Sequence, residues 1–239
     1  MLGLPLKGVI EALYSSSISL VTAANAEHFK RVLSQLKKFG LLLESDPRLP
    51  SVSTLITGSP LHSSWWSHPL AQTIFHVNGQ LDDHPDVLVT KLIAGKVTFV
   101  HKKLWPEILA IGTARERWQT EALSASAQAL LEMIGATGCL RTDKLILPGS
   151  TKGSMKLKPG DAARELERKL LVHAAQFHTD SGAHAKLLET WEHWVRRIGF
   201  TAASISVDEA KKKMEARLSK LNAQFKATAR LPWMKPGSQ

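Results

Sequence analysis

Apolar residues recur every three or four positions in several segments of this chain, a spacing typical of helices that bury one side. In one segment Phe29, Val32 and Leu36 form a single stripe, and Gly40 follows where helices commonly end. In another, Ser206 and Glu209 match the capping pattern that opens a helix. The same spacing predicts further helices over residues 70–81, 124–136, 161–178 and 183–198. We therefore expect a chain that is mainly α-helical.

One segment, at about 87–101, has a different character. Val87–Ile93 and Lys96–His101 are rich in β-branched residues, and Ala94-Gly95 separates them. Two such runs with a short break predict a β-hairpin. Because alanine is unfavourable in a two-residue primed turn, the loop is expected to be longer than two residues. The predicted fold class is mainly α with a small β-hairpin, an α+β fold.

Two stretches of the chain echo each other. Residues 29–46 and 127–143 both read as a helix that leads through a glycine into a short strand. Two units of this kind would suit tandem winged-helix modules. Separately, a helix, a glycine-containing turn and a second helix over 161–199 fit the outline of a helix-turn-helix.

Composition narrows the class of protein. The chain has 239 residues and one cysteine, Cys139, so an internal disulfide and a cysteine-based zinc site are excluded. No apolar run approaches the roughly 20 residues needed to cross a bilayer, and we expect a cytoplasmic protein without a membrane partner. The Gly-, Ser- and Lys-rich segment 148–160 predicts a flexible linker between an N-terminal lobe, 1–147, and a basic C-terminal lobe, 161–239.

The formal net charge is +10, and most of the excess lies in the last third of the chain. A local positive field attracts polyanions, so we expect a nucleic acid, most simply DNA, as the partner. Lysines contact phosphates without reading bases, which predicts salt-sensitive binding of weak sequence selectivity. The candidate contacts are Lys152, Lys156, Lys158, Lys186, Arg196, Arg197, Lys211, Lys212, Lys213 and Lys220.

Trp65 and Trp66 are candidates for stacking on bases. Adjacent tryptophans cannot both point the same way on a strand, so one of the two is expected to be in the core. The other would then be available to a nucleic acid.

Two Asp/His pairs are candidates for catalysis in an alternative reading, a hydrolase that acts on nucleic acid. Asp180 and His184 flank a glycine, and such an aspartate could stabilise a cationic sugar in base excision. Asp86 and His101 border the hairpin, where a divalent metal could serve phosphodiester cleavage. His173 lies between apolar residues and is expected to be a hydrogen-bonded core histidine.

Other enzyme classes lose support because their signatures are missing from the sequence. There is no Walker loop, no dinucleotide-binding glycine motif, no nucleophile elbow and no His-Glu-x-x-His. No cofactor is expected, apart from the divalent metal of a nuclease. A third class remains open, a protein-interaction module without chemistry whose tryptophans are all in the core.

Overall fold

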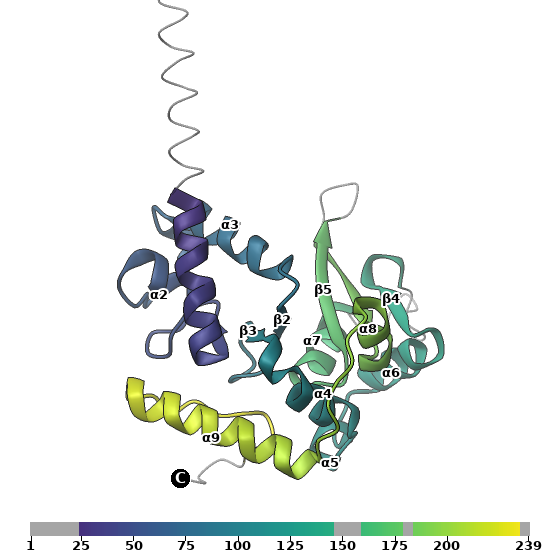
Figure 1. Cartoon of the computed structure of the whole chain (residues 1–239). Helices are drawn as coiled ribbons and strands as arrows, with labels where there is room; N and C mark the ends of the chain where they lie inside the picture. The colour runs from purple at the N-terminus through teal and green to yellow at the C-terminus, as the bar shows by residue number, and fades with distance from the viewer. Residues whose placement is uncertain (1–23, 146–158, 179–183, 235–239) are drawn as a thin grey trace, which may run out of the picture.

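The computed structural model describes residues 24–145, 159–178 and 184–234. About 55% of the described residues are helical, and these residues also form two small antiparallel sheets of three strands each (Figure 1). This confirms the α+β fold class with helix predominant. Within the described residues, no helix is both long and apolar enough to cross a membrane.

The first unit, residues 24–101, is built around the predicted hairpin. A helix over 24–39 leads through Gly40 into β1 (Leu41–Leu43), followed by α2 (Val52–Thr57) and α3 (Ala71–Asp82). Strands β2 (Val87–Thr90) and β3 (Thr98–His101) form the hairpin, and the sheet has the order β1-β3-β2. The loop is longer than two residues, as expected, and Ala94 and Gly95 both have positive φ, 50° and 68°.

The second unit, residues 125–189, has the same arrangement. Helix α6 (Ala125–Thr137) leads through Gly138 into β4 (Cys139–Arg141), and α7 (Pro159–Arg168) precedes strands β5 (His173–His178) and β6 (His184–Glu189). The sheet order is β4-β6-β5, which matches the first unit strand for strand. Gly40 and Gly138 have the same φ of 79°, a conformation that favours glycine. The echo in the sequence therefore corresponds to two units with one topology.

The helix-turn-helix predicted over 161–199 is wrong. Helix α7 ends at Arg168, and the segment expected to be its last turns is β5. The first part of the expected second helix is β6, so that only α8 (Trp191–Ile198) is helical. Leu170 is the reason for the early end, because it adopts φ 52° and closes the helix with bonds from Leu170 N to Glu167 O and from Leu171 N to Leu166 O. Glycine usually occupies that position, so a leucine there is not recognised as the end of a helix.

Two strands of the second sheet pair across the segment that was predicted to separate an N-terminal from a C-terminal lobe. Strand β4 precedes the linker predicted at 148–160 and β6 follows it, yet the two strands pair from Cys139↔Glu189 to Arg141↔Leu187. A sheet therefore joins the N-terminal and C-terminal sides of that segment. Residues 148–158 themselves lie outside the described part of the chain.

The remaining helices connect the two units. They are α4 (Trp105–Thr113), α5 (Arg117–Thr120), α8 and α9 (Val207–Phe225). The 3-10 turn η2 (Lys102–Leu104) leads into α4, whereas η1 (Trp65–Ser67) lies in the first unit and η3 (Thr142–Lys144) in the second. A shared core joins Val100 of the first unit to Trp105 of α4, Trp191 of α8 and Met214 of α9. Figure 1 shows α9 running below the helix over 24–39, back toward the first unit.

Candidate nucleic-acid interface

Helix α9 presents its lysines outward because Ala210, Met214, Leu218 and Leu221 bury the opposite side. Carboxylates offset several of the predicted contacts. Lys211 donates to both carboxylate oxygens of Glu116, at 2.9 and 2.7 Å, and Lys213 pairs with Glu209 at 2.9 Å. Lys186 pairs with Glu167 and Arg197 with Glu189. Of the predicted contacts that lie in the described residues, Lys212, Lys220 and Arg196 are exposed and have no carboxylate partner there. Three further predicted contacts, Lys152, Lys156 and Lys158, lie outside the described residues.

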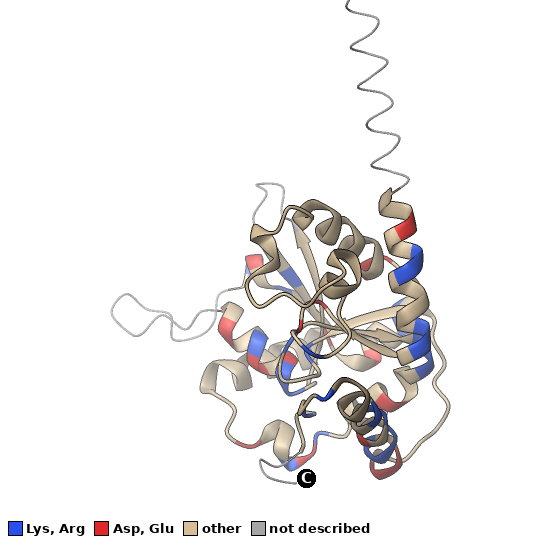
Figure 2. Ribbon diagram, turned by 90° about the vertical axis from the view of Figure 1, so that its left-hand side faces the viewer, with Lys and Arg blue, Asp and Glu red and all other residues tan. Residues whose placement is uncertain are grey.

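A second group of cations joins α9 to the end of the helix over 24–39. Arg217 Nη1 donates to Phe39 O at 2.8 Å, and Lys103 Nζ donates to the backbone oxygens of Lys37 and Lys38. Lys37 and Lys38 are exposed, and Lys220 lies one turn from Arg217 on α9. We name Lys37, Lys38, Lys103, Arg217 and Lys220 the basic ridge. In Figure 2 the Lys and Arg positions are blue, and they occur on both the helix over 24–39 and α9, which lie next to each other.

Neighbouring cations lower the pKa values of two groups at the ridge, Lys103 and His101. Burial lowers the pKa of Lys103, and the guanidinium of Arg217 lowers it further. Burial also lowers the pKa of His101, and the charges of Lys103 and Lys37 lower it further. The carboxylate of Asp86 acts in the opposite direction and raises it. Cations gathered this closely concentrate positive potential, which attracts a phosphate backbone. The sequence did not indicate this ridge, because it forms only when α9 folds back onto the first unit.

The two adjacent tryptophans divide as expected into one buried and one exposed ring. Trp65 is 6% exposed and Trp66 is 63% exposed, and their rings stack with centroids 3.9 Å apart. Phe75 of α3 is 43% exposed and lies 5.9 Å from Trp66. An exposed indole that rests on a buried one is held in place, and its free face can accept a planar group.

A carboxyl group, that of Glu44, contacts the buried tryptophan Trp65. Burial raises the pKa of Glu44, although a hydrogen bond from Trp65 acts in the opposite direction. Asn78 Nδ2 also donates to Glu44 Oε1, at 3.3 Å. Glu44 was not among the candidates, because a single Glu after a short strand carries no motif.

The Asp86/His101 pair is brought together, but in a local hydrogen-bonded corner of the hairpin. Asp86 pairs with Lys102 at 3.3 Å, and His101 Nδ1 accepts from Lys103 N at 3.3 Å. In the described part of the chain, no three His, Cys, Asp or Glu side chains form a group that could hold a metal ion. For the other pair, Asp180 lies outside the described residues, and only the backbone of His184, in β6, is described.

His173 belongs to a cluster of polar side chains that connects α8 to the second sheet through Glu189. As expected, His173 is buried and hydrogen-bonded, with Nδ1 3.2 Å from Glu189 Oε2. Glu189 is fully buried and also binds His193 Nδ1 at 2.8 Å and the Arg197 guanidinium at 2.8 and 2.7 Å. The four-residue spacing of Glu189, His193 and Arg197 was a usable signal that the sequence analysis missed, although only His193 and Arg197 lie on the helix.

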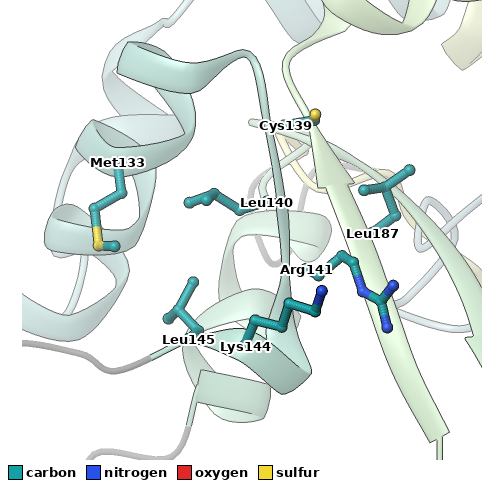
Figure 3. Close-up of a pocket in the computed structure, with 7 residues that line it drawn as sticks. All are labelled: Met133, Cys139, Leu140, Arg141, Lys144, Leu145 and Leu187. Atoms are coloured by element: carbon teal, nitrogen blue, oxygen red, sulfur yellow. The ribbon is translucent and has the colours of Figure 1, made fainter. Parts of the chain in front are cut away.

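A surface pocket of about 340 Å³ lies beside β4, and Figure 3 shows the side chains around it. None of the predicted site residues lines it. Its lining is apolar apart from two cations, and consists of Met133, Cys139, Leu140, Arg141, Lys144, Leu145 and Leu187.

Comparison with known proteins identifies the family of the chain. Neither the curated proteins nor the solved structures gave a match. The family model described as AlkZ related matches residues 24–231, which spans both sheets, the basic ridge and the tryptophan pair. AlkZ itself is a DNA-repair protein. Since the match covers most of the chain, the protein belongs to the AlkZ-related family.

Proposed function

We propose that this protein binds DNA in a repair process, with phosphates on the basic ridge and bases against Trp66. The observation that carries the proposal is the ridge itself, where cations from two distant segments meet at the carbonyl end of one helix. Lys212, which is exposed on α9, adds a further cation to the same helix. Membership of the AlkZ-related family supports DNA as the polyanion.

The topology of the two units supports the same function. In each unit a helix leads to an edge strand, and a hairpin completes a sheet of the order 1-3-2. We assign both as winged-helix modules, in which the helix before the hairpin is the usual DNA-facing element. Helix α3 holds that position in the first unit and presents Phe75 and His76 to solvent. An aromatic face favours stacking over hydrogen-bonded base readout, in agreement with weak sequence selectivity.

Neutralising the ridge tests the phosphate contacts. The double variant K37Q/K38Q is expected to bind duplex DNA roughly ten-fold more weakly at moderate salt. The slope of log affinity against log salt should fall by about 2, because each lost phosphate contact removes about 0.9 from it. Fluorescence anisotropy over a salt series measures both quantities.

The matched control removes two exposed cations away from the ridge, R117Q/K144Q. It carries the same net charge as the ridge variant, so a merely global charge effect would weaken both equally. Equal loss in the two variants, or salt-independent binding by the wild type, would refute the ridge as the DNA contact.

Removing the exposed indole tests the stacking contact. Trp66→Ala is expected to weaken binding to single-stranded DNA by about 1 kcal/mol, the lower end of what one stacked base contributes. The midpoint of urea unfolding should change little, because Trp66 is 63% exposed. Leu70→Ala, at 36% exposed, is the control for loss of nearby apolar surface. If the two variants bind equally well, Trp66 does not stack on DNA.

A further inference from the structure

Two lysines converge on one buried carboxylate where the two units meet. Lys91 lies in the loop after β2, Lys186 in β6 and Glu167 in α7. Lys186 Nζ bonds Glu167 Oε1, and Lys91 Nζ lies 3.5 Å from Glu167 Oε2. Figure 1 shows β2 of the first unit beside β5 of the second. The cluster therefore draws on both units.

The charges in this cluster are not balanced. One carboxylate, 8% exposed, faces two ammonium groups, and the Lys91 side chain is only 20% exposed. Glu167 Oε2 is buried and accepts no hydrogen bond from the described residues. Lys91 is therefore ion-paired with Glu167 at the long end of the range, while Lys186 holds the other oxygen closely.

The surroundings favour the neutral amine of Lys91. Burial lowers the pKa of Lys91, and the charges of Lys186 and Arg164 lower it further against the pull of Glu167. A lysine that is desolvated beside another cation is the usual form of a Schiff-base nucleophile. The charge of Lys91 also acts on Glu44, whose pKa it lowers against the effect of burial. Glu44 is hydrogen-bonded to Trp65, and the exposed Trp66 stacks on Trp65. The amine and the proposed stacking platform thus belong to one region.

We propose that Lys91 forms a Schiff base with the open-chain aldehyde of an abasic site in DNA and so cleaves the strand. This inference rests on the DNA binding proposed above. The substrate class follows from the chemistry, since an amine nucleophile needs a carbonyl and an abasic deoxyribose exposes one at C1′. An enzyme or reaction that removes a base from DNA must supply it.

The steps balance without an oxidant or reductant. The Lys91 amine adds to the C1′ aldehyde, and the resulting carbinolamine takes up a proton from the solvent and loses water to give a protonated imine. The imine acidifies the C2′ hydrogen, and the Glu167 carboxylate, which lies 3.5 Å from the Lys91 nitrogen, accepts that proton. The C3′–O bond then breaks, and the 3′ phosphate leaves with its electron pair. Hydrolysis of the imine releases the amine and the unsaturated sugar.

Trapping with borohydride tests the proposal on the full chain. The probe is a duplex oligonucleotide with one abasic site, incubated with the protein and sodium borohydride. The wild type is expected to form a covalent protein–DNA adduct, with the modification mapped to Lys91 by mass spectrometry. Lys91→Arg keeps a cation beside Glu167 but provides no amine nucleophile. We expect it to lose at least ten-fold in adduct while it remains folded.

Lys96→Arg is the matched control, because Lys96 is an exposed lysine of the same loop that pairs with Asp46 at 2.7 Å. It should form adduct as the wild type does. An unchanged yield in Lys91→Arg, or a yield lost only in Lys186→Arg, would overturn the assignment. Anisotropy with the same DNA separates the two proposals: binding without adduct overturns only the lyase, and no binding overturns both.

Discussion

Replacing Glu189 with glutamine is expected to lower the free energy of unfolding by about 3 kcal/mol, the lower end of the cost of breaking a buried ion pair. Glu189 is fully buried and is the common partner of His173, His193 and Arg197. The amide has one acceptor oxygen where the carboxylate had two, and it carries no charge to face the guanidinium. Arg197 is 45% exposed and can turn toward water, which keeps the loss at the lower end. Urea unfolding followed by tryptophan fluorescence measures it.

The exposed pair of Arg117 and Glu121 provides the control. Their side chains are 87% and 55% exposed, so Glu121→Gln is expected to change stability by less than about 0.5 kcal/mol. A comparably small change in Glu189→Gln would mean that the cluster contributes little and that α8 is held by its tryptophans alone.

The pH dependence of the Glu189 effect has a definite sign. Burial by itself would raise the pKa of Glu189, but the hydrogen bonds from His173, Arg197 and His193 lower it far below the usual range. A carboxyl with a depressed folded-state pKa stabilises the fold above its unfolded pKa of about 4.3 and loses that contribution as the pH falls. The difference between wild type and Glu189→Gln should therefore be full at pH 7 and shrink below about pH 4.

Local signals were sufficient for much of the first unit. The stripe from Phe29 to Leu36, the stop at Gly40 and the β-branched hairpin all lie within one stretch of sequence. Each signal agrees with the tertiary structure, and the elements form where the sequence predicted them. The matching pair Gly40 and Gly138 even indicated the repeated topology, because a positive φ after a helix is a local requirement.

The second unit was misread where pairing across the sheet overrode local spacing. His173 to His178 can be drawn on a helix, and only the partner strand decides otherwise, through pairs such as His173↔Glu189. The turn at Leu170 was hidden because a leucine occupies a conformation usually taken by glycine. The basic ridge and the Lys91 cluster depend on contacts between residues far apart in the chain, so no local pattern could reveal them.

Gly112→Ala is expected to destabilise the protein by about 2 kcal/mol, although alanine is the better helix former by about 1 kcal/mol. Gly112 lies in α4 against Trp191 of α8, and a Cβ there would lie 2.4 Å from the indole Nε1. Trp191 cannot retreat easily, because it is 2% exposed and its Nε1 donates to Leu170 O at 2.7 Å. The clash therefore outweighs the gain in helix propensity.

A double-mutant cycle identifies the cause of the loss. Trp191→Phe removes the indole nitrogen that the new methyl group would meet, so Gly112→Ala should cost clearly less in that background than in the wild type. Gly135→Ala is the matched control, because Gly135 lies within α6 and an added Cβ meets nothing within 4 Å. It should stabilise the protein by up to about 1 kcal/mol. If Gly112→Ala also stabilises, α4 and α8 can separate at this contact, and the packing that joins the two units is looser than the indole hydrogen bond implies.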